Sequence, residues 1–235
     1  VVVKDKKLAG TRCLIRPNGL HPVDGTVVIV ELTKYTNEKN RSSLEGIVVK
    51  EIGYKDAVGM DILMILQQLH IPTEFPQEVI DQANLVPEVI ADEDRKGRKD
   101  LREQLTVTID GADAKDLDDA VALTKREDGT FELTVSIADV SYYVTENSAI
   151  DREAFERGTS VYLTDRVVPM LPQRLSNGIC SLHPHEERLT MSCRMEIDRS
   201  GTIYQYEIFP SVIRSDMRLT YSLVNELYEK KEVEI

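Results

Sequence analysis

The strongest restriction on the fold of this chain is a cluster of aspartates between two predicted strands. Five aspartates fall within the ten residues from Asp110 to Asp119. Before them, residues 105–109 alternate apolar side chains with threonines, which is the period of a half-buried strand. After them, the apolar run of residues 120–123 begins a second extended segment. The sequence therefore predicts an acidic loop that joins two strands.

Such a loop is electrostatically unfavourable without a cation. Two carboxylates about 4 Å apart repel by roughly 4 kcal/mol at an effective dielectric constant near 20. Carboxylate oxygens suit Mg²⁺ or Mn²⁺. A calcium loop of the EF-hand type is excluded, because it needs acids at its third and fifth positions, where counting from Asp110 gives Ala112 and Ala114. An exposed acidic loop without a metal remains the alternative.

The spacing of the last two aspartates predicts irregular backbone. In a regular strand, Asp118 and Asp119 would face opposite sides of the sheet. If both side chains serve one site, the chain near Leu117 must depart from strand geometry, as is usual in catalytic loops. Gly111 allows the backbone to turn directly after the first strand.

The aspartate segment, Thr108-Ile-Asp-Gly-Ala-Asp-Ala-Lys-Asp-Leu-Asp-Asp-Ala-Val121, resembles the catalytic aspartate segment of the RNB exoribonucleases, the ribonuclease II and ribonuclease R family. Three later segments, residues 136–144, 157–163 and 169–182, resemble that family in the same order. Four matched segments in order are far more specific than one motif. Within the family, the chain looks most like the bacterial ribonuclease R branch.

This resemblance implies a hydrolytic exoribonuclease. The family degrades single-stranded RNA processively from the 3′ end to nucleoside 5′-monophosphates with Mg²⁺, or with Mn²⁺ in its place, and with no small-molecule cofactor. By resemblance, Asp110 and Asp119 hold a metal with the scissile phosphate, while Asp116 and Asp118 hold or orient the second metal and the attacking water. These four aspartates are the predicted metal ligands, and Asp116 and Asp118 are the predicted catalytic residues.

An aromatic residue completes the implied site. Tyr162 lies in a predicted strand, and the family's equivalent tyrosine stacks near the 3′ end of the RNA. Every base offers a π-face, so stacking tolerates any sequence. A place for Tyr162 in the protein core remains the alternative.

A function from another class also remains open: a non-catalytic RNA-binding module whose acidic loop binds a cation. The family's catalytic arginine and its C-terminal RNA-binding barrel come from sequence beyond Ile235. We therefore interpret the chain as a piece of a longer protein, with little activity and weak Mg²⁺ binding on its own. The chain begins without an initiating Met or a segment of signal-peptide type.

The predicted fold class is α+β, in three parts. Residues 1–57 are expected to form a partial OB-type (cold-shock) β-barrel, with strands at residues 1–4, 13–16, 26–34 and 44–52. Residues 58–100 are expected to form a helical connector, and residues 101–235 the N-terminal part of a mixed α/β RNB catalytic domain. The barrel either contacts RNA or is purely structural, and both interpretations remain open.

Local signals place further elements. Residues 60–69 predict an apolar helix, and a second helix begins near Pro76. The charged run at residues 92–99 is interpreted as a solvated linker rather than an RNA-binding patch. Asp139, at a strand end, either caps a turn or lies beside the metal. Ser148 and Asp151 form a capping box, which predicts a helix that ends at Gly158.

Composition adds three limits. The net charge of −12 argues against a nucleic-acid partner, although residues 1–57 hold ten Lys and Arg against seven Asp and Glu. No apolar run approaches the length of about 20 residues that a membrane-spanning helix needs. The three cysteines lack a Cys-x-x-Cys spacing, which predicts free thiols in a reducing cytoplasm.

Overall fold

The computed structural model describes residues 1–4, 8, 11–35 and 44–230. The chain forms two compact units. Unit 1 comprises Val1–Glu74 and Tyr162–Val168, and unit 2 comprises Phe75–Val161 and Pro169–Ile235. The expected three-part division, with boundaries at residues 57 and 100, stays a prediction. The boundary between the two compact units falls at a different place, after Glu74.

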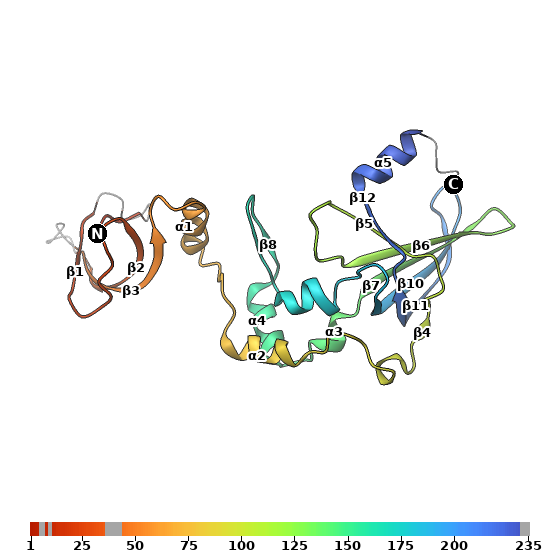
Figure 1. Cartoon of the computed structure of the whole chain (residues 1–235), viewed down its shortest axis with the longest axis horizontal. Coiled ribbons are helices and arrows are strands. Elements are labelled where there is room, and N and C mark those ends of the chain that lie inside the picture. Colours follow the sequence, from red (N-terminus) through yellow and green to blue (C-terminus); the bar gives the residue numbers. More distant parts are fainter. Residues whose placement is uncertain (5–7, 9–10, 36–43, 231–235) are drawn as a thin grey trace. The chain divides into compact units, whose positions relative to one another are not determined.

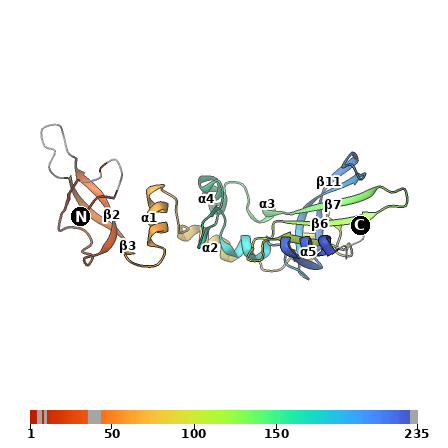
Figure 2. The same cartoon turned by 90° about the horizontal axis from the view of Figure 1, so that it is seen from above.

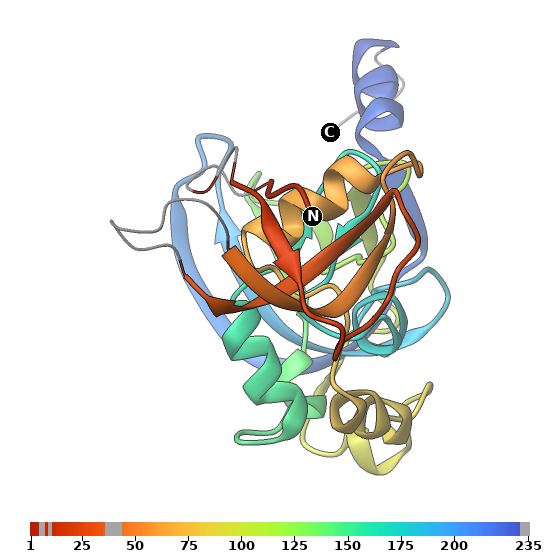
Figure 3. The same cartoon turned by 90° about the vertical axis from the view of Figure 1, so that its left-hand side faces the viewer.

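Unit 1 is a three-stranded sheet with a helix beside it, as Figure 3 shows. Its strands follow the order β1-β3-β2, with β1 parallel and β2 antiparallel to β3. The elements are β1 (Cys13–Ile15), β2 (Thr26–Lys34), β3 (Leu44–Tyr54), α1 (Met60–Gln68) and the short paired strands β8 (Val161–Tyr162) and β9 (Val167–Val168). The strand expected at residues 1–4 is wrong, because in the described residues Val2 forms only an isolated bridge to Arg12.

Strand β3 shows why this sequence forms a sheet. Leu44 and Val48 are buried, and Gly46 lies between them on the same side of the strand. A Cβ atom at Gly46 would lie 2.4 Å from Val30 Cγ1 and 2.7 Å from the Glu31 carbonyl oxygen, so only glycine lets β2 approach β3 this closely. The apolar helix α1 adds the buried Met60 and Leu66 to the core of unit 1.

Unit 2 is built on a seven-stranded mixed sheet in the order β12-β5-β6-β7-β10-β11-β4 (Figure 1). Its five central strands are antiparallel, and each edge strand is parallel to its neighbour. The strands are β4 (Lys99–Asp100), β5 (Val107–Asp110), β6 (Asp119–Lys125), β7 (Phe131–Ala138), β10 (Glu187–Ile197), β11 (Ile203–Arg214) and β12 (Met217–Thr220). Figure 2 shows β6, β7 and β11 extending together along the sheet.

One helix of unit 2, α4 (Ala149–Arg157), agrees with the capping signal in the sequence. The helices of unit 2 have the following bounds. They are α2 (Gln77–Leu85), η2 (Glu93–Arg95), α3 (Val140–Tyr143), α4 (Ala149–Arg157), η3 (Leu175–Ile179) and α5 (Tyr221–Lys230). Ser148 Oγ accepts a hydrogen bond from the Asp151 amide at 3.1 Å, which confirms the start of α4. Gly158 follows the helix with a φ of 71°, a left-handed value that favours glycine.

The core of unit 2 packs α2, α4 and the segment around η3 against the sheet. Val79 of α2, Ile150 of α4, and Leu175 and Leu182 are buried, together with Leu189 at the start of β10. Within the described residues, no helix is long and apolar enough to cross a bilayer. The three cysteines are free, as predicted.

The charged run at residues 92–99 is not a solvated linker, and that interpretation was wrong. Arg98 Nη2 donates to Asp139 Oδ2 at 2.6 Å, and both side chains are only 9% exposed. Arg95 binds Glu187 at 2.6 Å, and Lys99 begins edge strand β4. Asp139 also accepts a hydrogen bond from Ser141 Oγ at 2.9 Å. Its carboxylate thus holds this segment and the start of α3 to the sheet.

Candidate active site

The aspartate loop, residues 110–119, connects two neighbouring strands as predicted. Strand β5 ends at Asp110 and β6 begins at Asp119, and residues 111–118 between them contain no helix or strand. The amide of Ala114 donates to the Gly111 carbonyl at 3.2 Å, which closes a turn directly after β5. The expected irregular backbone near Leu117 is confirmed.

Leu117 is the anchor of the loop. Its side chain is fully buried, its amide donates to Ser181 Oγ at 3.0 Å, and its carbonyl accepts from the Leu182 amide at 2.9 Å. Ser181 Oγ also donates to the Lys115 carbonyl at 2.8 Å. The backbone on both sides of Asp116 is therefore held by the segment that follows η3.

A second contact holds the first half of the loop. Arg218 of β12 uses Nη2 to donate to the carbonyls of Gly111, Ala112 and Ala114, at 3.1, 3.0 and 2.8 Å. Strand β12 runs parallel to β5, and Thr220 lies in register with Asp110. The arginine thus reaches the loop from the strand beside the one that leads into it.

Burial and neighbouring carboxylates raise the pKa values of two aspartates, Asp118 and Asp110. Partial burial raises the pKa of Asp118 above its usual range, and the charges of Asp116, Asp119 and Asp110 raise it further. Burial likewise raises the pKa of Asp110, assisted by Asp119 and Asp116, while the positive charge of Arg218 lowers it. The four predicted site residues therefore lie within electrostatic reach of one another.

The four carboxylates do not form a ready-made ligand set. Among the described residues, no group of three or more His, Cys, Asp or Glu side chains is arranged to hold a metal ion. The chemistry of the donors nevertheless fits Mg²⁺, since all are carboxylate oxygens. Asp110 Oδ2 is also buried without a hydrogen-bond partner, and such an atom gains most from a cation. The metal-ligand assignment of Asp110, Asp116, Asp118 and Asp119 stays a prediction.

Tyr162 is a surface residue. It ends the short strand β8, belongs to unit 1, and is 64% exposed. The alternative that its ring fills the core is therefore wrong. Its stacking on RNA stays a prediction.

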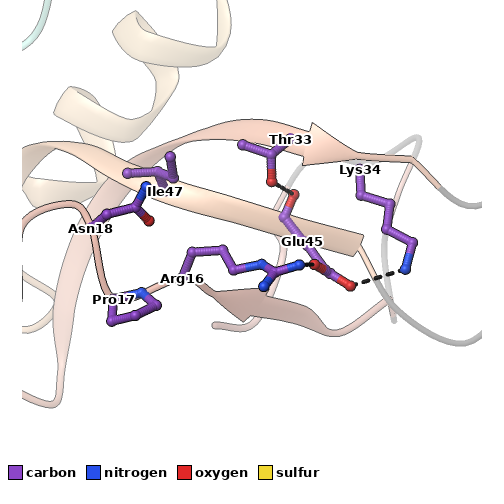
Figure 4. A pocket seen from close by; sticks show the side chains of 7 residues that line it. All are labelled: Arg16, Pro17, Asn18, Thr33, Lys34, Glu45 and Ile47. Carbon is purple, nitrogen blue, oxygen red and sulfur yellow. Dashed lines mark hydrogen bonds and ion pairs between the residues drawn. The ribbon is translucent and has the colours of Figure 1, made fainter.

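Unit 1 contains a polar hollow lined by Arg16, Pro17, Asn18, Thr33, Lys34, Glu45 and Ile47 (Figure 4). Arg16 and Lys34 both bind the carboxylate of Glu45. Hydrogen bonds from Lys34 and then Arg16 hold the pKa of Glu45 below its usual range. Two cations around one carboxylate leave an excess of one positive charge, and both cationic side chains are exposed.

Two residues that shape the site were missed from the sequence. Ser181 lies in the matched segment 169–182, where the resemblance assigned no role to single residues. Arg218 lies in Met217-Arg-Leu-Thr220, where no local pattern separates it from any exposed strand arginine. Their partners in the loop are at least 64 residues away in the chain, so no sequence window could reveal them.

Comparisons with known proteins agree with this architecture. The RNB domain family matches residues 98–235, and the cold shock domain family matches residues 1–76. Ribonuclease R 1 of Lactococcus lactis is 52% identical over 216 residues, which cover 92% of this chain and 26% of that protein. Ribonuclease R of Thermotoga maritima is 52% identical over 204 residues, covering 86% of this chain and 28% of that protein.

Solved structures show the same likeness. Mycoplasma genitalium RNase R in complex with double-stranded RNA superimposes with a TM-score of 0.86 at 31% identity, and the match covers 96% of this chain and 40% of that one. The chain belongs to the RNB domain family. It spans about a quarter of the length of these curated relatives. The predicted α+β class, with a partial cold-shock barrel ahead of an RNB domain, is confirmed.

Proposed function

We propose that the protein containing this chain is an exoribonuclease that hydrolyses single-stranded RNA processively from the 3′ end to nucleoside 5′-monophosphates. Membership of the RNB family and the likeness to ribonucleases R support this reaction. The observation that carries it is the aspartate loop: four carboxylates act on one another electrostatically, on a backbone tied down by Ser181 and Arg218.

The aspartates divide the work as follows. Asp110 and Asp119 are proposed to hold Mg²⁺ with the scissile phosphate, and Asp116 and Asp118 to hold or orient a second Mg²⁺ and the attacking water. When bound, Mg²⁺ would polarise the phosphate and lower the pKa of coordinated water. Mn²⁺ has similar ligand preferences and is expected to substitute.

The decisive experiment replaces Asp118 in the full-length protein. RNA labelled at its 5′ end is incubated with Mg²⁺ or Mn²⁺, so that processive shortening from the 3′ end converts the full-length band directly into a short labelled end product. Asp118→Asn should lower kcat by about 10³-fold or more, because the lost ligand acts on the transition state. RNA affinity should change less than about tenfold, since phosphate and stacking contacts dominate binding.

The matched control is Asp113→Asn. It removes one negative charge from the same loop at a position outside the proposed ligand set. It should keep kcat within about fivefold of the wild type, as surface substitutions usually do. An equal loss of activity in both variants would mean that loop charge in general is responsible. A wild-type protein that binds RNA without hydrolysing it would favour the non-catalytic binding module.

Tyr162 is proposed to stack on a base near the 3′ end. One stacking contact contributes about 1–3 kcal/mol, and its loss is felt most when few nucleotides remain bound. Tyr162→Ala should therefore lengthen the final product more than it weakens initial binding, as read on a sequencing gel. Tyr162→Phe keeps the ring and should keep the end product. End products identical for Ala and wild type would remove Tyr162 from the RNA site.

A further inference from the structure

We propose that Arg218 is a positioning residue of the aspartate loop, whose guanidinium fixes the turn at residues 111–114 and thereby the placement of the carboxylates on either side of it. The inference deepens the proposed function and rests on it for the effect on catalysis. Its effect on cation binding can be measured without catalysis.

The geometry around Arg218 is unusual for a surface arginine. A single nitrogen, Nη2, lies 3.1, 3.0 and 2.8 Å from the carbonyl oxygens of Gly111, Ala112 and Ala114. That nitrogen carries two hydrogens, so the three acceptors share them. The turn after β5 therefore curls around the guanidinium, and the carbonyls converge on one point.

Convergent carbonyls need a positive charge. Their oxygens carry partial negative charges that repel when they point at the same place, and a guanidinium offsets this with charge-assisted hydrogen bonds. Arg218 is committed to this task, because within the described ranges of the chain it makes no ion pair with a carboxylate. Its Nε is buried without a partner, an unfavourable feature that its other contacts must outweigh.

Arg218 does not itself pair with a carboxylate of the loop. It lies close enough to act electrostatically on Asp110, yet its hydrogen bonds go to backbone atoms. A cation that instead paired with a carboxylate would compete with a metal for that ligand. A metal-binding loop therefore gains from a supporting residue that holds its backbone and not its ligands.

A role of Arg218 in stability alone can be distinguished from a role in positioning the loop. Arg174 offers the matched comparison within unit 2, since its Nε and Nη2 donate to the Val86 carbonyl at 3.1 and 2.9 Å. Arg174 therefore also binds a backbone oxygen, but at a site that does not include the aspartate loop. If arginine-to-carbonyl contacts only add stability, variants at the two positions should behave alike.

The experiment compares Arg218→Met, Arg218→Lys and Arg174→Met in the full-length protein. Binding of Mn²⁺ to RNA-free protein is followed by electron paramagnetic resonance, thermal unfolding gives Tm, and RNA hydrolysis gives kcat and KM separately. Arg218→Met should weaken Mn²⁺ binding about tenfold and lower kcat about 10²-fold, the size typical of residues that support metal ligands. KM for RNA should stay within about threefold. Arg218→Lys keeps a charge and donors and should restore about tenfold in kcat.

Arg174→Met should lower Tm while leaving Mn²⁺ affinity and kcat within about twofold of the wild type. If Arg218→Met has no folding transition, Arg218→Gln replaces it, because glutamine keeps an NH₂ donor without the charge. Mn²⁺ affinities that match between the Arg218 and Arg174 variants would overturn the inference. So would a lysine variant no better than the methionine one. A wild type without RNA hydrolysis refutes the proposed function instead, and the Mn²⁺ titration still decides the role of Arg218.

Discussion

Two segments of unit 2 are rich in charged residues, but their charged side chains make different contacts. In the charged segment, residues 92–102, arginines bind carboxylates: Arg98 binds Asp139 at 2.6 Å, and Arg95 and Arg102 bind Glu187 at 2.6 and 2.7 Å. In the aspartate loop, the nearby arginine donates to backbone carbonyls, and burial together with the neighbouring carboxylates raises the pKa of Asp118. One segment is neutralised by the fold, while the other keeps excess negative charge.

The difference teaches that density of charge in a sequence does not reveal function. Both segments are rich in charged residues, and both look like solvated surface when viewed alone. What separates them is where the partner charges lie in the fold. A carboxylate that pairs with a cation within the fold adds to structure, whereas a group of carboxylates gathered in one loop is poised to bind a cation from solution.

The largest expected effect on stability is at the buried ion pair. Asp139→Ala would leave the Arg98 guanidinium, whose side chain is 9% exposed, without its counterion. Removing one partner of a buried pair typically destabilises by about 3–5 kcal/mol. The midpoint of thermal or urea unfolding of the full-length protein should fall accordingly. Below that transition, kcat for RNA should stay within about fivefold, because Asp139 is not proposed to touch the metal or the RNA.

A double variant sharpens this prediction. Arg98→Met combined with Asp139→Leu removes both charges and should recover much of the lost stability, since no unpaired buried charge remains. A loss of kcat by more than about 10²-fold in Asp139→Ala at full folding would instead place Asp139 in the active site. In that case the charged segment would also contribute to the active site, and the two segments would no longer differ in function.

The next effect is a pH dependence of opposite sign in the two segments. Burial raises the pKa of Glu187, but hydrogen bonds from Arg102 and Arg95 outweigh it and hold that pKa below its usual range. Its stabilising contribution is therefore present above about pH 4.3, the usual glutamate value, and is lost as the pH falls through the folded value. Glu187→Gln should lower Tm at pH 7, by the equivalent of about 1 kcal/mol, and less at pH 4.

Asp118 should show the reverse. Its pKa is raised, so in EDTA its ionisation opposes folding at pH 7, and that penalty disappears as the pH falls and the carboxylate becomes protonated. Asp118→Asn should therefore raise Tm at pH 7 and have less effect at pH 4. Calorimetry of both variants between pH 4 and 7 tests the pair together. A lower Tm for Asp118→Asn at pH 7 would contradict the description of the loop as self-repelling.

Local patterns allowed much of the site to be predicted from the sequence. The alternation at residues 105–109 and the apolar run at residues 120–123 predict the strands on the two sides of the loop, β5 and β6. The capping box at Ser148 fixes a helix start, because its hydrogen bond spans only three residues. The crowding of Asp110 to Asp119 marks the loop itself. Each signal lies within a single short window of the chain.

Long-range partners are what the sequence could not show. Arg95 and Arg98 are 92 and 41 residues from Glu187 and Asp139, so the charged run looked unpaired in the sequence. Arg218 is more than a hundred residues from the turn that it holds. Only the sheet order, which sets β12 beside β5, brings them together. Whether charged side chains from distant segments pair therefore depends on the order of the strands in the sheet.

The smallest expected effect tests the surface of the charged segment. Lys96 and Glu93 form an ion pair in which the side chains are 72% and 77% exposed. Exposed pairs contribute about 0–1 kcal/mol, and salt screens them further, so Lys96→Gln should change stability by less than about 0.5 kcal/mol.

RNA affinity measured against salt concentration gives the second test of this variant. If Lys96 contacts an RNA phosphate, the slope of log K against log salt should fall by about 0.7 for single-stranded RNA. We expect an unchanged slope, because in this segment the arginines already serve the fold. A reduced slope would make the charged segment an RNA-binding surface as well as a structural one.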